Sequence, residues 1–151
     1  MNTLSKPEDR EHISTRLSQL SPQDAARWGT MSVHQMICHL DDSYKTVLGA
    51  KQVSSATGFR PRPVLKWLAL KVPMKWPHNV PTRPEVEQGK GGSRPADFRQ
   101  DLASLLSTFD RFCAAIPEPC LPHPFFGPMT VEDWMRWGYL HPDHHLRQFG
   151  R

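Results

Sequence analysis

Apolar residues recur at spacings of three and four along four stretches of this chain, which is the pattern of helices that bury one face. The predicted helices cover residues 5–20, 32–48, 93–116 and 130–149. Ser32 followed by Gln35, and Thr130 followed by Asp133, supply capping signals at the start of two of them. Because no stretch of useful length alternates between apolar and polar residues, the pattern predicts an all-α protein.

The connections between these helices are unequal in length. One short turn of helix is predicted at residues 21–28, and a much longer connection covers residues 50–94. Within it, a short helix is predicted over residues 64–72, after which prolines prevent continuation. Four main helices with one long crossover, which holds the short extra helix, are typical of a four-helix bundle. The chain length fits a single domain over residues 1–151.

The formal net charge of +4 is modest, and its densest part is a basic stretch with aromatic residues between the charges. This stretch contains Phe59, Arg60, Arg62, Lys66, Trp67, Lys71, Lys75 and Trp76. Such a pattern occurs in nucleic-acid contacts and also on solvated helix faces. The second interpretation is favoured because the chain lacks a nucleic-acid-binding motif, so we expect no nucleic-acid partner.

Two further features bear on the cellular context. Three cysteines without a close-spaced pair argue against a disulfide framework and against a cysteine zinc site. The polar N-terminus is unlike a signal peptide, and no apolar run approaches the roughly 20 residues of a membrane helix. These features predict a cytoplasmic protein without membrane contact.

Histidines carry the candidate chemistry. His141 and His145 are one helical turn apart, so they share the inward face of the last predicted helix with Trp134. His39 lies just beyond the edge of the apolar stripe on the second helix, where it can reach a cleft between packed helices. Neutral imidazole is a common ligand for divalent metals. His39, His141 and His145 therefore predict a metal site with positions left open for water or substrate.

Several neighbouring residues leave alternatives open. The predicted ligands could instead be core histidines whose hydrogen bonds are satisfied by Gln148, Tyr139 or a backbone carbonyl. His34 is a rival for the third ligand position. Cys38 could be a soft metal ligand, a reactive thiol or a small buried apolar residue.

Other positions near the predicted ligands carry separate expectations. Asp42 could orient the His39 imidazole as a hydrogen-bond acceptor, or it could be a surface carboxylate. His144 is predicted to lie outside the ligand set, nearer to solvent. Pro142 removes the backbone donor for the Gly138 carbonyl, which predicts a kink or a widened turn between these two residues. The remaining histidines are expected at the surface or in loops, and these are His12, His78 and His123.

Three segments of the chain carry a resemblance to a known family. They are Met36–Leu40, residues 76–85 with the later Gly91-Gly92 pair, and His141–Phe149. They resemble the DinB-like superfamily and, more narrowly, its branch of unknown function called DUF1569. The resemblance covers nearly the whole chain, and the terminal segment is its most specific part.

The resemblance implies a fold and a cofactor. It implies a four-helix bundle with a long crossover, commonly a homodimer, that holds a divalent metal ion by three histidines. Nickel or zinc is the most common metal, with iron or manganese as further choices. His39, His141 and His145 match the family's ligand positions, and Gln148 matches the glutamine that commonly follows them. Pro142 departs from the family's pattern.

The resemblance also implies a class of function. Some DinB-like relatives are thiol transferases or thiol-dependent isomerases and hydrolases. We therefore expect a metal-dependent enzyme that activates a low-molecular-weight thiol or water toward a small electrophilic substrate. Trp134, Trp137, Met36 and the crossover at residues 60–85 are expected to shape its pocket. Non-enzymatic metal binding, for sensing or structure, and a metal-free bundle with packed histidines are the alternatives.

Overall fold

The computed structural model describes residues 1–52, 63–78 and 84–151. The elements in chain order are α1 (Pro7–Ser18), α2 (Val33–Val47), α3 (Pro63–Lys71), the 3-10 helix η1 (Pro84–Val86), α4 (Phe98–Ala114) and α5 (Val131–Gln148). The described ranges contain no β-strand, so the predicted all-α class is confirmed for them. No helix in those ranges is both long enough and apolar enough to cross a membrane.

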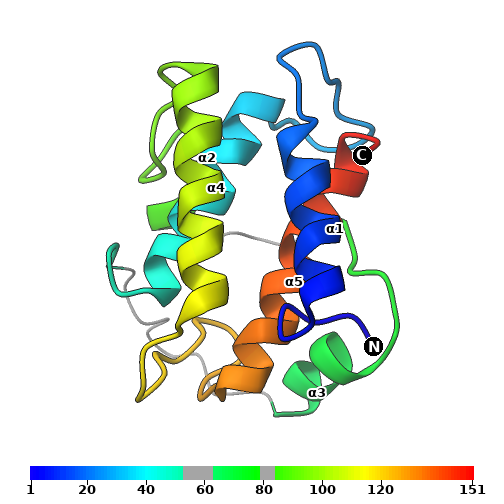
Figure 1. The fold of residues 1–151 in the computed structure, drawn as a ribbon, viewed down its shortest axis with the longest axis vertical. Helices are drawn as coiled ribbons and strands as arrows, with labels where there is room; N and C mark the ends of the chain where they lie inside the picture. Colours follow the sequence, from blue (N-terminus) through cyan, green and yellow to red (C-terminus); the bar gives the residue numbers. More distant parts are fainter. Residues whose placement is uncertain (53–62, 79–83) are drawn as a thin grey trace.

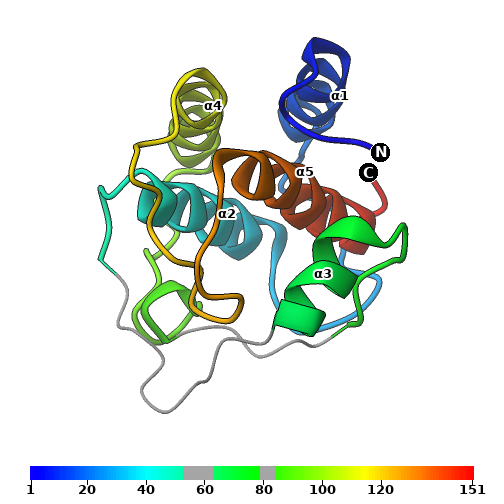
Figure 2. The same ribbon diagram turned by 90° about the horizontal axis from the view of Figure 1, so that it is seen from below.

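The four long helices lie in two layers. α1 packs against α4 and α5, and α2 packs against the same two helices. Figure 2 shows α1 with α4 as one layer and α2 with α5 as the other, with α3 beside α5. In Figure 1 the long axes of α1 and α4 run side by side. The core contains large, fully buried side chains, which include Tyr44, Leu105, Phe109, Phe112 and Leu146.

The capping signals form the hydrogen bonds that the sequence predicts. The Ser32 hydroxyl accepts from the Gln35 N–H at 3.1 Å, and the Gln35 side chain accepts from the Ser32 N–H at 2.9 Å. Thr130 and Asp133 form the same reciprocal pair at 3.1 and 3.2 Å. These bonds satisfy backbone donors that have no partner inside the helix, and so they fix where α2 and α5 begin.

The predicted turn of helix at residues 21–28 is wrong. The Asp24 carboxylate accepts a hydrogen bond from the Ser21 N–H at 3.0 Å, which forms a turn instead. Further along, the Arg27 N–H donates to the Gln148 carbonyl at 2.7 Å. This contact holds the segment against the C-terminal end of α5. In a helix, the Arg27 N–H would instead donate to a carbonyl of the same helix.

α4 begins later than predicted. Its first residue is Phe98 rather than residue 93, because the Asp97 side chain caps the helix by accepting from the Gln100 N–H at 2.9 Å. Ser93 is instead bound to the Asp42 side chain of α2 through its N–H and its hydroxyl, each at 2.7 Å. The stretch before α4 is therefore fastened to α2 and is not helical.

α5 continues through Pro142. A proline inside a helix cannot donate to the carbonyl four residues earlier, which here belongs to Gly138. The Tyr44 hydroxyl of α2 donates to this carbonyl at 2.8 Å and replaces the missing partner. A larger residue does not fit at position 138, because a Cβ there would lie 2.5 Å from the Phe112 ring. The kink at this place stays a prediction.

Local contacts account for two lysines of the basic stretch. The Lys66 ammonium forms an ion pair with the Asp133 carboxylate at 2.6 Å, and the Lys71 ammonium lies 3.8 Å from the other oxygen of that carboxylate. Both lysines thus lie at the contact of α3 with α5. This is compatible with the interpretation of the basic stretch as a solvated helix face. Three other residues of the stretch lie outside the described ranges, and these are Phe59, Arg60 and Arg62.

Candidate metal centre

The structure brings together the three histidines that the sequence predicts as ligands. His39 comes from α2, and His141 and His145 come from α5, which packs against α2. One ligand atom from each lies within 4.8 Å of the other two, and the Nε2 atoms of His39 and His141 are 3.1 Å apart. Nitrogens that share one ion at bonds of about 2.1 Å are expected roughly 3.0–3.4 Å apart. This pair therefore already has the spacing of two ligands.

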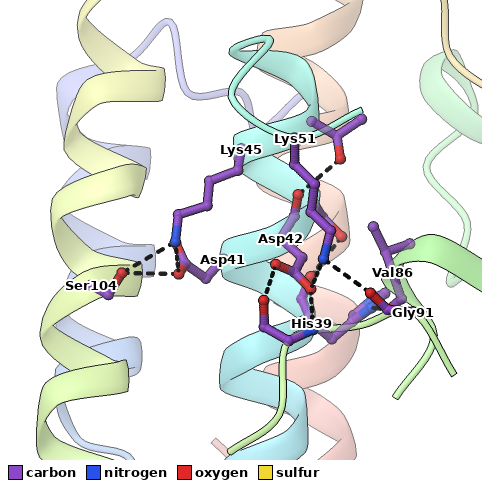
Figure 3. Close-up of polar contacts among 11 residues, drawn as sticks. His39, Asp41, Asp42, Lys45, Lys51, Val86, Gly91 and Ser104 are labelled. Atoms are coloured by element: carbon purple, nitrogen blue, oxygen red, sulfur yellow. Dashed lines mark hydrogen bonds and ion pairs between the residues drawn. The ribbon is translucent and has the colours of Figure 1, made fainter. Parts of the chain in front are cut away.

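The His39 ring is oriented by the 3-10 helix η1. Its Nδ1 donates to the Val86 carbonyl at 2.9 Å, since a carbonyl can only accept (Figure 3). A neutral imidazole carries one proton, so Nε2 keeps a free lone pair directed toward the other histidines. The alternative in which Asp42 accepts a hydrogen bond from the His39 ring is wrong, because the Val86 carbonyl takes that position.

A tight turn holds the Val86 carbonyl in place. The Gly91 N–H donates to the Pro84 carbonyl at 2.8 Å. A side chain does not fit at position 91, because a Cβ there would lie 2.8 Å from both the Pro84 carbonyl oxygen and the Glu85 Cα. This glycine of the Gly91-Gly92 pair thus has a packing role, since it lets the turn close beside α2.

Asp42 fastens the end of this turn to α2. Asp42 is 1% exposed, and its carboxylate accepts from the Lys51 ammonium at 2.6 Å (Figure 3). The same carboxylate accepts from the N–H and the hydroxyl of Ser93. The alternative that placed Asp42 at the surface is therefore also wrong. Asp42 acts on the His39 ring indirectly, by holding the turn that carries Val86.

Gln148 orients the His145 ring. The Gln148 amide nitrogen donates to the Trp28 carbonyl at 2.8 Å, so the amide oxygen is the atom that faces Nδ1 of His145 at 2.9 Å. An amide oxygen only accepts, which places the His145 proton on Nδ1 and leaves Nε2 with a lone pair. Gln148 thus satisfies one nitrogen of this ring and leaves the other for the site.

Hydrogen bonding does not satisfy the His141 ring. Its Nδ1 is inaccessible to solvent and has no hydrogen-bond partner among the residues that the structure describes. Its Nε2 faces the lone pair of His39 at 3.1 Å. Without an ion, either two lone pairs meet there or Nδ1 of His141 remains a bare buried acceptor. A divalent cation removes the conflict between the lone pairs, so this donor set fits a metal ion.

Burial favours the neutral form of all three rings. Desolvation is the largest cause that lowers the pKa of each, and the Val86 carbonyl opposes it at His39. Charge repulsion from the other two rings lowers the pKa of His141 further, so it falls well below the usual histidine range, as does that of His145. Neutral imidazole is the form that binds a metal, so near pH 7 a metal ion need not displace a proton.

A cavity of about 800 Å³ lies beside the triad of His39, His141 and His145, whose rings form part of its wall. The rest of the wall is largely apolar and includes Trp28, Leu68, Trp76, Phe126, Trp134 and Trp137. Both tryptophans predicted from α5, and residues of the crossover, line the cavity as the sequence indicates. Met36 does not, because it is fully buried in the core, so that prediction is wrong.

His123 lies in a loop, as predicted, but it also lines the cavity, which the sequence reasoning missed. Its Nδ1 accepts from the backbone N–H groups of Phe125 and Phe126 at 3.1 and 3.3 Å. Burial lowers the pKa of His123 to about 3, so the ring is neutral. The sequence signal for this arrangement is weak and consists of the aromatic pair followed by Gly127, whose φ of 72° closes the turn.

Aromatic rings surround His144 in another part of the cavity wall. This residue lines the cavity but stays outside the ligand triad, as predicted. Its ring centroid lies 5.9 Å from that of Trp28 and 6.3 Å from that of Trp76. The exposed His78 stacks on Trp28 at 4.0 Å, which extends this aromatic wall outward.

A second cluster of ligand-type side chains lies where α2 meets α4. The Asp101 carboxylate lies 2.7 Å from Nε2 of His34, accepts from the Ala96 N–H at 3.0 Å, and is 3.9 Å from the Cys38 sulfur. Burial acts to raise the pKa of Asp101, but the bonds from Ala96 and His34 outweigh it and lower the pKa. Burial and the nearby carboxylates raise the pKa of the Cys38 thiol to about 12. His34 is therefore engaged away from the triad, and Cys38 is a buried neutral thiol.

A protein-family model described as "Protein of unknown function (DUF1569)" matches residues 6–151. Neither the curated proteins nor the solved structures include a match to this chain. The matched range contains the three histidines, the turn that carries Val86 and the loop that carries His123. The broader relation to the DinB-like superfamily stays a prediction.

Proposed function

We propose that this chain, which belongs to the DUF1569 family, binds one divalent metal ion through Nε2 of His39, His141 and His145 and uses it as an enzyme. One observation carries the proposal. The Val86 carbonyl and the Gln148 amide oxygen each hold a ring proton on Nδ1, so the Nε2 lone pairs of His39 and His145 stay free, and Nε2 of His39 lies 3.1 Å from Nε2 of the third imidazole. A divalent cation is a partner that these free lone pairs can share.

The ligand set and its surroundings narrow the kind of site. Imidazole suits several divalent ions. The resemblance to the DinB-like superfamily favours Ni²⁺ or Zn²⁺ among them, with Fe²⁺ or Mn²⁺ as further choices. Three protein ligands leave coordination positions free, as at catalytic zinc sites. The cavity of about 800 Å³ beside the triad offers room for a substrate, which favours an enzyme over a purely structural site.

The chemistry follows from three neutral ligands. A divalent ion held by them keeps its full charge and lowers the pKa of a thiol or water that it binds. The chain's own residues make the surroundings of the site apolar, since the Trp137 ring lies 4.7 Å and the Trp76 ring 6.4 Å from the His141 ring. We propose a low-molecular-weight thiol or water as the nucleophile and a small electrophile as the substrate. The reaction would be thiol transfer or hydrolysis.

Further parts of the proposal concern the whole molecule. The two layers formed by α1, α2, α4 and α5 support a four-helix bundle of the DinB-like type, with the crossover between α2 and α4, in a single domain over residues 1–151. A homodimer is what the resemblance implies, and a cytoplasmic location and the lack of nucleic-acid and membrane partners are predictions from the sequence.

Elemental analysis of untagged protein tests the metal site. Wild-type protein should contain about one divalent ion per chain, whereas His39→Ala and His141→Ala should each retain less than about a tenth of it. His12→Ala is the matched control, because His12 is exposed and contacts Tyr139 instead of the triad. Wild-type protein that stays metal-free after reconstitution, or ligand variants that keep the ion, would contradict the proposal.

Activity assays separate the enzyme from the non-enzymatic alternative. Metal-loaded protein is combined with thiols and electrophiles of several classes, and product formation is compared between wild type and His145→Ala. We expect turnover that His145→Ala reduces at least about a hundredfold, as for other groups that complete a catalytic site. Metal-dependent stability without turnover or an exchangeable ligand would indicate a structural or sensing role.

A further inference from the structure

The wall of the cavity beside the triad offers few charges to a ligand. Among the described residues that line it, Lys75 is the one lysine or arginine, and none is an aspartate or a glutamate. Four tryptophans line it, which are Trp28, Trp76, Trp134 and Trp137. An ion that enters such a cavity loses its hydration without gaining a matching counter-charge, so the wall favours a neutral ligand with an aromatic ring.

Within this apolar wall, His123 has its proton fixed at one position. Its Nδ1 accepts from the N–H groups of Phe125 and Phe126, so Nδ1 cannot carry a proton. The single proton of the neutral ring is therefore on Nε2. No hydrogen bond from Nε2 to an acceptor is found within the described part of the chain. Since His123 lines the cavity, its fixed N–H donor is available to a ligand there.

The position of His123 connects this donor to the triad. Its ring centroid lies 5.8 Å from that of Trp137, whose ring is in turn 4.7 Å from that of His141. The Trp134 ring lies 5.5 Å from His123. A ligand packed against these two tryptophans can therefore reach both the donor and the triad.

We propose that His123 is a substrate-binding residue, whose Nε2–H donates to one oxygen of a neutral, ring-bearing substrate packed against Trp134 and Trp137. The substrate's reacting atom then faces the triad. This second statement rests on the proposed function, whereas the binding of the substrate by His123 does not. A substrate without an acceptor leaves the His123 donor unpaired, so His123 selects for the oxygen.

Ligand binding to metal-free wild-type protein tests the proposal. The probes are 2-acetonaphthone, which has a ring and one carbonyl, and 2-ethylnaphthalene, which has the same ring and no acceptor. Quenching of the four cavity tryptophans reports binding. We expect the ketone to bind about tenfold more tightly than the hydrocarbon. His123→Phe should remove this preference by weakening the ketone alone, and the control His12→Phe should keep it.

A measurement on the unmodified chain keeps the proposal testable if His123→Phe does not fold. Nitrogen-15 NMR of wild-type protein should show Nδ1 of His123 unprotonated and Nε2 protonated, and the ketone but not the hydrocarbon should shift the Nε2–H signal. Equal affinity for the two probes, a preference that survives His123→Phe, or tighter binding of 2-naphthoate than of the ketone would overturn the proposal. Because no metal is present, a failure here is distinct from a failure of the metal site.

Discussion

α2 contributes to two clusters of metal-ligand side chains that look alike in composition and differ in their hydrogen bonds. His39 joins His141 and His145 of α5, while His34 and Cys38 join Asp101 of α4, and in each cluster the ligand atoms lie within 4.8 Å of one another. In the triad, Nδ1 of His39 and Nδ1 of His145 donate to acceptors outside the cluster, which leaves their Nε2 lone pairs free within it. In the second cluster, the ligand atoms of His34 and Cys38 are hydrogen-bonded to the Asp101 carboxylate.

This difference shows that proximity of ligand-type residues does not identify a metal site by itself. His34 and Asp101 already form a hydrogen-bonded pair at 2.7 Å, so an ion would have to break it. Cys38 must lose a proton to bind a metal, and its pKa of about 12 makes that costly at neutral pH. The second cluster is therefore interpreted as a clamp between α2 and α4, and the triad stays the proposed metal site.

The largest expected difference between the clusters is in metal-induced stabilisation. Zn²⁺ at a hundred times its Kd should raise the free energy of unfolding of the wild-type protein by about 2.7 kcal/mol. His39→Ala should abolish this increase, while His34→Ala should keep it, as followed by denaturant unfolding with and without the metal. The reverse pattern would mean that the ion binds between α2 and α4.

A smaller effect is expected from the groups that orient the ligands. Gln148→Met removes the acceptor that holds the proton on Nδ1 of His145, so the Kd for the metal should rise about 10–100-fold. Asp101→Asn alters the second cluster and should leave that Kd unchanged. Competition with a chelator measures both values. An unchanged Kd in Gln148→Met would show that the orientation of His145 does not depend on this bond.

The clusters should also respond to acid in different ranges. The pKa values of the triad are lowered from the ordinary 6.5, so the unfolded chain binds more protons and the metal-free protein loses stability as the pH falls below about 6.5. The loss is up to about 1.4 kcal/mol per pH unit for each histidine. The pKa of Asp101 is lowered from 3.8, so its contribution is lost only below about pH 4. Between pH 6.5 and 4.5, His141→Phe should flatten the slope of unfolding free energy, and Asp101→Asn should not.

The smallest expected effect is the stability of the clamp at neutral pH. Asp101→Asn weakens the bonds from His34 and the Ala96 N–H, so the free energy of unfolding should fall by about 1 kcal/mol. Urea denaturation at pH 7 measures it, with the exposed pair variant Glu87→Gln as a control for loss of a surface charge. A loss equal to that of the control would remove the case for a clamp.

The regular parts of the site could be predicted from the sequence. Helical spacing places His141 and His145 on one face, and the capping signals at Ser32 and Thr130 locate the starts of α2 and α5. The apolar stripe of α2 places His39 toward a packed neighbour. These features are local, since each depends on residues within a few turns of helix.

The parts that the sequence reasoning missed depend on contacts between distant segments. The acceptor for His39 is a backbone carbonyl at Val86, which no side-chain pattern can reveal. The role of Asp42 requires knowing that Ser93 returns to α2. The role of His123 could be recognised only from the course of the loop before α5, because backbone donors of that loop set its tautomer.

X-ray absorption of the zinc-loaded wild-type protein tests the central claim most directly, because it reports the atoms bound to the ion. The account predicts nitrogen or oxygen ligands at about 2.0–2.1 Å, three of them imidazoles, and no sulfur. A sulfur ligand at about 2.3 Å with a single imidazole would place the ion at His34, Cys38 and Asp101 and would contradict the account.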